Sequence, residues 1–172
     1  YLDALEKEID YTAAKFYHKH LNSIYIGGGT PTTLEPYQLD RLIRKIKCSF
    51  DLSDCLEFTV EAGRPDSITR EKLEVLRKWG ITRISINPQT MQQRTLDLIG
   101  RRHSVEQTVE SFKIARELGF DDINMDLIMG LPEESLEDVR DTLEQIMQLK
   151  PDNLTVHSLA LKRAARLNMF KE

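Results

Sequence analysis

The sequence predicts an α/β protein that folds as a partial (β/α) barrel of about five parallel strands with outer helices. Segments with strand character alternate with segments of helical periodicity, which is typical of parallel sheets joined by right-handed crossovers. Polar and apolar residues also alternate within each predicted strand, so the two faces of the sheet must have different surroundings.

Five short runs rich in β-branched and aromatic residues are predicted to be strands. The first belongs to an apolar run, residues 21–26, that we expect to be buried and that leads into three consecutive glycines. The predicted strands span residues 23–27, 55–61, 82–87, 121–128 and 153–158.

Helical spacing of apolar residues fills the intervals between these strands. The predicted helices begin with an acidic amphipathic segment over residues 1–9 and continue with 37–49, 68–79, 104–118 and 135–150. Capping-box patterns at Thr90 with Gln93 and at Ser104 with Gln107 predict the starts of a short and a longer helix. Ser135 begins a similar pattern at the last helix.

The alternation within the strands predicts one apolar and one polar face of the sheet. Phe58 and Val60 alternate with Glu57, Thr59 and Glu61, and the later strands repeat this pattern through Leu154 and Val156 against Thr155 and His157. The amphipathic helices must cover the apolar face. Because buried carboxylates are costly unless they are paired or solvated, we expect the polar face to line a wet or ligand-filled cavity, partly through an ion pair of Glu57 with Arg83.

Composition limits the class of protein. The 172 residues are of one-domain size, with 40% hydrophobic residues and a formal net charge of -4, and the cations are dispersed. These values argue against nucleic acid as a partner. No apolar run is long enough for a membrane span and no signal sequence is evident, so we expect a cytoplasmic protein. Cys48 and Cys55 fit neither a disulfide framework nor a zinc site, and we expect both to be small core residues.

The candidate ligand site lies at the C-terminal ends of the predicted strands, where barrels of this kind bind their ligands. Glycine allows the backbone itself to approach a ligand. Carboxylates and an amide suit a ligand that has an amine and hydroxyl groups, while an arginine suits a carboxylate. The residues concerned are Gly28, Gly29, Thr30, Glu61, Asn87, Gln89, Arg101 and Asp126. The neighbours Arg102 and His103 are expected to be solvent-facing or structural.

The ordered set of motifs resembles that of radical S-adenosylmethionine enzymes, in particular the oxygen-independent coproporphyrinogen III oxidase or coproporphyrinogen dehydrogenase-like group. The motifs are Gly27-Gly-Gly-Thr-Pro-Thr32, Glu61, Ser85-Ile-Asn-Pro-Gln89, Gly100-Arg101 and Asn124-Met-Asp-Leu-Ile-Met-Gly-Leu-Pro132. The resemblance runs from the first helix to the strand that ends at Ser158.

The resemblance implies a role for each site residue. Gly28, Gly29 and Thr30 would hold the methionyl amino end of S-adenosylmethionine, and Glu61 would accept hydrogen bonds from the ligand. Gln89, Arg101 and Asp126 would bind its ribose and carboxylate regions, while Ile128 and Ala160 would pack around the adenine. The implied reaction is reductive cleavage of S-adenosylmethionine by a [4Fe-4S] cluster, followed by radical oxidation of a tetrapyrrole such as coproporphyrinogen III in porphyrin and haem biosynthesis.

The chain departs from this family in one respect. The Cys-x-x-x-Cys-x-x-Cys motif that holds the family's cluster is absent, so we expect a piece of a longer protein that lacks the first strand and the cluster loop. Residues 1–158 would then be a partial core, and 159–172 a tail that leads to a substrate domain. We expect no cluster, no metal, weak or no binding of S-adenosylmethionine, no activity of this chain alone, and self-association through the exposed edge of strand 23–27.

Two further hypotheses stay open at this point. The chain could be an ordinary (β/α) barrel that uses Glu61 and Asp126 as an acid and base, with the glycines cradling a phosphate. It could also be a non-catalytic protein that binds haem, another tetrapyrrole or S-adenosylmethionine. The sequence alone does not identify the substrate, because the group that it resembles includes oxidases, haem chaperones and methyltransferases. A basic cluster in the tail, Lys162, Arg163, Arg166 and Lys171, is read as a solvated face.

Overall fold

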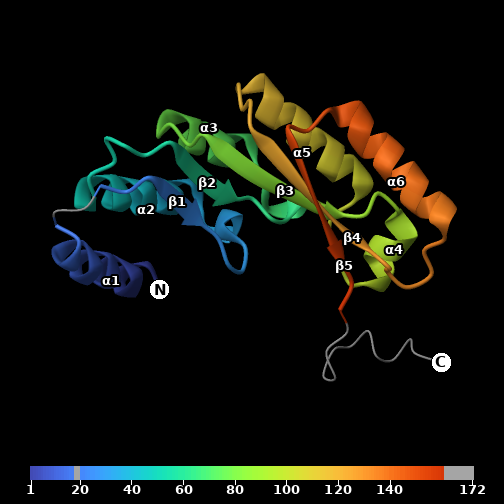
Figure 1. Cartoon of the computed structure of the whole chain (residues 1–172), viewed down its shortest axis with the longest axis horizontal. Coiled ribbons are helices and arrows are strands. Elements are labelled where there is room, and N and C mark those ends of the chain that lie inside the picture. The colour runs from blue at the N-terminus through green and yellow to red at the C-terminus, as the bar shows by residue number, and fades with distance from the viewer. Residues whose placement is uncertain (18–19, 161–172) are drawn as a thin grey trace.

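The computed structural model describes residues 1–17 and 20–160. Within them, parallel strands form one sheet in the sequential order β1-β2-β3-β4-β5. The sheet extends across the molecule in Figure 1. The strands span Ser23–Ile26 (β1), Glu57–Glu61 (β2), Arg83–Gln89 (β3), Ile123–Met129 (β4) and Asn153–Ser158 (β5). The predicted α/β class with five parallel strands is therefore confirmed.

Helices separate the strands along the chain, as predicted, and α2, α3, α5 and α6 lie along one side of the sheet (Figure 1). Each of these four connects two neighbouring parallel strands, while α1 precedes β1 and packs against α2. The α-helices span Leu2–Lys15 (α1), Pro36–Ser49 (α2), Arg70–Lys78 (α3), Gln93–Leu98 (α4), Val105–Glu117 (α5) and Leu136–Leu149 (α6), and short 3-10 helices cover Pro31–Thr33 and Pro65–Ser67.

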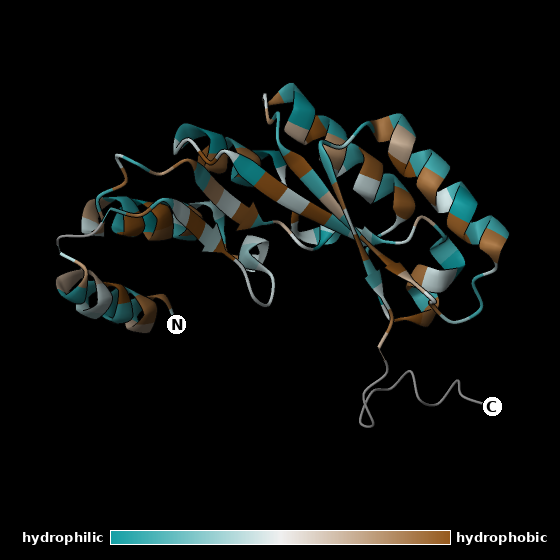
Figure 2. Ribbon diagram, in the orientation of Figure 1, coloured by the Kyte–Doolittle hydropathy of each residue, from teal (hydrophilic) through white to brown (hydrophobic). Residues whose placement is uncertain are grey.

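The core lies between the helices and the apolar face of the sheet. Val60, Ile84, Ile123 and Met125 are fully buried there. Brown and teal residues alternate along the strands in Figure 2, as the polar and apolar alternation of the sequence requires. Burial of this face provides the main driving force for the fold.

The two outer strands differ from the prediction. β1 is a free edge of the described sheet and is half exposed, so the expectation of a buried strand over residues 21–26 is wrong. On β5, Leu154 and Val156 remain 36% and 48% exposed, because no described helix covers the apolar face of that strand. The predicted coverage of the apolar face therefore holds for the central strands β2, β3 and β4 and fails on β5.

Two of the three predicted helix starts are confirmed. Ser104 and Ser135 each accept a hydrogen bond from the third helical N–H and complete a capping box. Thr90 caps no helix, since α4 begins only at Gln93 and the Thr90 hydroxyl instead contacts Glu134 and Thr142. The Thr90 hydroxyl also accepts from the Gln92 N–H at 3.2 Å, so tertiary contacts accompany a local bond that differs from the predicted one.

The expectation that both cysteines are core residues is also wrong. Cys48 is exposed on α2, and Cys55 is half-buried just before β2, where its thiol donates to the carbonyl of Glu57. Cys48 lies on the outward face of an amphipathic helix whose buried residues are Leu39, Leu42, Ile43 and Ile46.

Candidate functional site

The glycine run after β1 forms an open backbone surface. Gly28 and Gly29 have φ angles of 78° and 60°, and a Cβ atom at either position would meet nothing within 4 Å. The Gly28 N–H donates to Glu61 Oε2 at 3.2 Å. Left-handed backbone explains why glycine is needed here, and the open space leaves room for a ligand against the main chain.

Glu61 is the last residue of β2 and the centre of a small polar group. Its Oε2 also accepts from the Tyr25 hydroxyl at 3.2 Å, and its Oε1 accepts from Asn87 Nδ2 at 3.4 Å. Partial burial and the neighbouring carboxylate of Glu61 raise the pKa of Tyr25, so the phenol stays a donor at neutral pH. Glu61 is only half-buried and keeps capacity to accept from a ligand.

Gln89 ends β3 at an irregularity of the sheet. Ile86 pairs with Met125 but Gln89 pairs with Leu127, so β3 carries one extra residue in this interval. Gln89 has a φ of 73°, which is uncommon for a residue with a side chain, and it is buried. Its side-chain amide lies 3.5 Å from the carbonyl oxygen of Asn87.

His103 supports this irregular end of β3. It is 1% exposed, and its Nε2 lies 3.2 Å from the carbonyl oxygen of Pro88, the residue before Gln89. Because a carbonyl only accepts, Nε2 must carry the proton. The expectation of a structural role is met, while solvent exposure is found at Arg102 and not at His103.

Asp126 lies inside β4 and not at its end, because the strand continues to Met129. Its Oδ1 accepts from Asn124 Nδ2 at 2.6 Å. Asp126 lines a polar hollow of about 220 Å³ on the face of the sheet opposite the core, together with Tyr25, Thr59, Arg83, Ser85, Asn124, Thr155 and His157. The prediction of a polar face with a cavity is met here.

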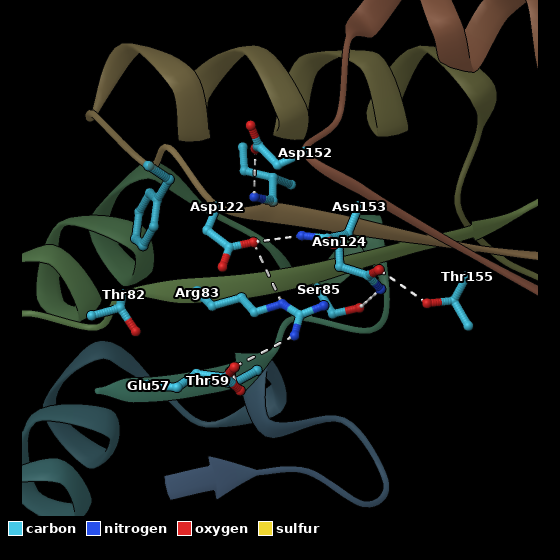
Figure 3. Close-up of polar contacts among 12 residues, drawn as sticks. Glu57, Thr59, Thr82, Arg83, Ser85, Asp122, Asn124, Asp152, Asn153 and Thr155 are labelled. Carbon is cyan, nitrogen blue, oxygen red and sulfur yellow. Dashed lines mark hydrogen bonds and ion pairs between the residues drawn. The ribbon is translucent and has the colours of Figure 1, made fainter. Parts of the chain in front are cut away.

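An ion-pair group occupies the same face of the sheet. Arg83 Nη1 lies 3.7 Å from Glu57 Oε2, and Arg83 Nε lies 3.5 Å from Asp122 Oδ1. Figure 3 shows this group with Asn153, which donates to Asp122 at 2.9 Å. The expected pair of Glu57 and Arg83 is confirmed, and Asp122 is a second partner that the sequence analysis missed.

The remaining candidates are Arg101, Ile128 and Ala160. Arg101 is half-buried, and burial first and the charge of Arg64 second lower its pKa. No hydrogen bond within residues 20–160 joins Arg101 to Glu61 or Asp126. Ile128 pairs with His157 across the sheet, and Ala160 follows β5 as an exposed residue.

The structure thus brings part of the predicted set together. Gly28 and Glu61 are bonded directly, and Gln89 reaches them through Asn87. Asp126 joins them through Asn124 and Ser85, which the sequence analysis did not assign to the site. Arg101, Ile128 and Ala160 make no direct side-chain hydrogen bond to this group in the described chain. Thr30 contributes its carbonyl to the turn, where it accepts from Thr33.

An apolar hollow adjoins the glycine loop. It has a volume of about 600 Å³ and lies between α1 and the free edge of β1. Leu5 and Ile9 of α1, Ile24 and Ile26 of β1, and Gly27 are among the lining residues. Gly27 has no space for a Cβ, which would come within 2.0 Å of the Tyr25 ring.

The described residues contain no group of three or more His, Cys, Asp or Glu side chains that could hold a metal ion. The whole sequence has two cysteines, on α2 and before β2. Since a [4Fe-4S] cluster is held by cysteine thiolates, the residues of this chain do not fit such a cluster. Among the same residues, no helix combines the length and the apolar character that crossing a membrane requires.

The parallel strands, the helices between them and the glycine loop after β1 define a partial (β/α) barrel, and a family model identifies its class. The model of the Radical SAM superfamily matches residues 3–146, so this chain belongs to that superfamily.

Three similar proteins show which part of the superfamily this chain resembles. The chain is 48% identical over 152 residues to the oxygen-independent coproporphyrinogen-III oxidase-like protein HemZ of Bacillus subtilis, and 40% identical over 166 residues to the heme chaperone HemW of the same organism. It covers 30% and 43% of the lengths of these proteins, with 88% and 94% of its own residues. The structure of coproporphyrinogen III oxidase (HemN) from Escherichia coli, described as a radical SAM enzyme, matches with a TM-score of 0.87 at 36% identity, over 93% of this chain and 37% of that one.

Proposed function

We propose that this chain forms the S-adenosylmethionine-binding part of a radical oxidoreductase that acts on a tetrapyrrole, in the manner of oxygen-independent coproporphyrinogen III oxidase. The observation that carries the proposal is the hydrogen bond between the Gly28 N–H and Glu61, next to the open backbone surface of the glycine loop. Carboxylate, amide and main-chain groups converge there, as an aminoacyl nucleoside requires.

Under this proposal each residue keeps the role that the resemblance implies. Gly28, Gly29 and Thr30 meet the amino end of the ligand, and Glu61 accepts from it. The other contacts are assigned to Gln89, Arg101 and Asp126 for the ribose and carboxylate, and to Ile128 and Ala160 for the adenine. The cluster that cleaves S-adenosylmethionine would come from chain outside these 172 residues, so this chain alone binds its ligand weakly and has no activity.

The test is a titration of the 15N-labelled chain with S-adenosylmethionine, followed by NMR. We expect a Kd on the order of 1 mM, about −4 kcal/mol, with shifts confined to the amides of Gly28, Gly29 and the residues near Glu61 and Gln89. Glu61→Gln abolishes these shifts, whereas Glu117→Gln on the far end of α5 leaves them in place. Shifts scattered over the surface, or unchanged in Glu61→Gln, contradict the proposal.

A second function is favoured by the relationship to the heme chaperone HemW, at 40% identity. In that case the chain belongs to a protein that binds haem and passes it on without radical oxidation. Titration with haem and observation of its absorption band separate the two. Saturable haem binding that S-adenosylmethionine does not alter supports the chaperone, and binding of S-adenosylmethionine without haem supports the oxidase.

Self-association through β1 is part of the proposal. β1 is a free edge of the described sheet, and unpaired strand edges favour association. Sedimentation velocity at increasing concentration should show dimers or larger species, and Ile24→Lys on this edge should reduce them. A strictly monomeric chain at all concentrations contradicts this part.

A further inference from the structure

Three buried polar residues connect Glu61 to Asp126 on the polar face of the sheet. Ser85 and Asn87 on β3 and Asn124 on β4 are only 6%, 5% and 5% exposed. Buried polar side chains are retained at a cost unless all their hydrogen bonds are made. The hydrogen-bond partners of these three residues therefore indicate their role.

The carboxylates of Glu61 and Asp126 determine how the side-chain amides of Asn87 and Asn124 are oriented. Asp126 Oδ1 can only accept, so the group 2.6 Å from it must be the Asn124 NH₂, and this NH₂ also donates to Ser85 Oγ at 3.0 Å. Likewise the Asn87 NH₂ must face Glu61, 3.4 Å from Oε1, which leaves Asn87 Oδ1 toward Ser85.

Ser85 is the hydroxyl that joins the two amides. Its oxygen accepts from Asn124, and its single proton therefore goes to Asn87 Oδ1, 2.7 Å away. Thr155 of β5 completes the series by donating to Asn124 Oδ1 at 3.0 Å. Figure 3 shows the part of this series formed by Thr155, Asn124 and Ser85. Every donor points the same way, from Thr155 to Glu61, with a branch to Asp126.

We infer that Ser85 is a positioning residue that holds Glu61 and Asp126 in a fixed relative orientation through Asn87 and Asn124. The inference rests on the proposed S-adenosylmethionine site, whose two carboxylates are the ends of the series. Only a side chain that accepts and donates at once fits between the two amides. In Ser85→Ala, Asn87 Oδ1 loses its donor and one Asn124 proton loses its acceptor. Asn124 is still held by Asp126 and Thr155, whereas Asn87 keeps only the 3.4 Å contact with Glu61 and becomes free to rotate away.

Ser111→Ala is the matched control. Ser111 is a serine of similar burial, 4% exposed on α5, and its hydroxyl donates at 3.4 Å to the carbonyl of Pro65, outside the series. Ser85→Thr is the rescue variant. It keeps the hydroxyl, and its added methyl group has the 220 Å³ hollow beside it.

The first measurement uses the chain without ligand. Side-chain amide protons of Asn87 and Asn124, observed by NMR, should exchange with solvent at least tenfold more slowly than those of the exposed Asn22. Ser85→Ala should raise the exchange at Asn87 about tenfold, while Ser111→Ala and Ser85→Thr keep it near the original rate. Fast exchange at Asn87 in the original chain overturns the inference, even if Ser85→Ala fails to fold.

The second measurement adds S-adenosylmethionine. Ser85→Ala should weaken its binding about tenfold, with a Tm no lower than that of Ser111→Ala. Equal affinity of Ser85→Ala and the original chain overturns the inference. If the original chain shows no binding at all, the proposed function fails, and the exchange rates still decide whether the series holds the two carboxylates.

Discussion

The Lys72 ammonium on α3 lies 2.7 Å from the carbonyl oxygen of Thr32, in the loop that follows the glycines. Lys72 is 8% exposed and also donates to the carbonyl of Ser67 at 3.1 Å. The Thr32 and Ser67 hydroxyls are bonded to each other as well. A single buried cation therefore fastens the glycine loop to the segment after β2.

Replacing this cation should loosen the loop. Lys72→Met keeps the length of the side chain but leaves one buried and one partly buried carbonyl without their donor, so we expect a loss of about 2–3 kcal/mol in the free energy of unfolding. Urea denaturation measures it. Lys113→Met, on the exposed side of α5, serves as the control and should change the free energy by less than about 0.5 kcal/mol. Equal effects of the two variants would show that the Lys72 contacts are not stabilising.

The left-handed backbone at Gly28 makes a prediction about ligand binding. Gly28→Ala should cost about 1–2 kcal/mol of stability because a Cβ strains a φ of 78°. Gly80→Ala, at the end of α3 with a φ of 70°, should cost a similar amount. Only Gly28→Ala should also abolish the shifts caused by S-adenosylmethionine. Loss of those shifts in Gly80→Ala as well would mean that general destabilisation explains the effect.

His103 predicts a pH dependence. Burial is the main cause that lowers its pKa below the usual 6.5. The folded chain therefore keeps a neutral imidazole, while the unfolded chain takes up a proton below pH 6.5. This contribution to stability is fully present above that pH and is lost as the pH falls from 6.5 toward the folded pKa. In His103→Gln, which retains a donor for Pro88, the free energy of unfolding should lose this part of its pH dependence. An unchanged dependence contradicts the assignment.

Asp138 also predicts a loss of stability in acid, at lower pH than His103. Its carboxylate accepts from the Ser135 N–H at 2.8 Å and from the Ser135 hydroxyl, and these bonds, with Arg94, lower its pKa. This stabilisation is present above the unfolded pKa of about 4 and is lost as the pH falls through the folded pKa. Asp138→Asn should lower the Tm by a few degrees at pH 7 and by much less near pH 2. A difference in Tm that stays constant with pH would contradict this reading.

The sequence predicted the order and type of the elements because local periodicity determines both. Amphipathic spacing located α2 and α3, the capping box at Ser104 located the start of α5, and the alternation on β2, β3 and β4 separated core residues from the polar face. The prediction that Thr90 caps a helix was wrong. The Thr90 hydroxyl contacts the hydroxyl of Thr142 on α6, and the two residues are far apart in the chain. Exposure of Leu154 and Val156 also depends on what packs over β5, which its own sequence does not encode.

The sequence predicted several residues of the site but not the hydrogen bonds that connect them. Glu61 and Gln89 were found because they end strands. Ser85 and Asn124 were placed on the polar face, but nothing in their spacing indicates that they bond to each other, since that depends on the register of β3 against β4. Lys72 was missed because a lysine in an amphipathic helix is usually exposed.

The extra residue between Ile86 and Gln89 determines the position along β3 at which Gln89 leaves the sheet. Deleting one residue there would let β3 and β4 pair without interruption, with Gln89 still opposite Leu127. The left-handed backbone at Gln89 would no longer be needed, so its side-chain amide would lose its position beside the carbonyl of Asn87, while the two carboxylates would stay on β2 and β4. Length in this short interval, more than the identity of any one side chain, therefore determines whether the rim of the sheet presents a complete set of polar groups.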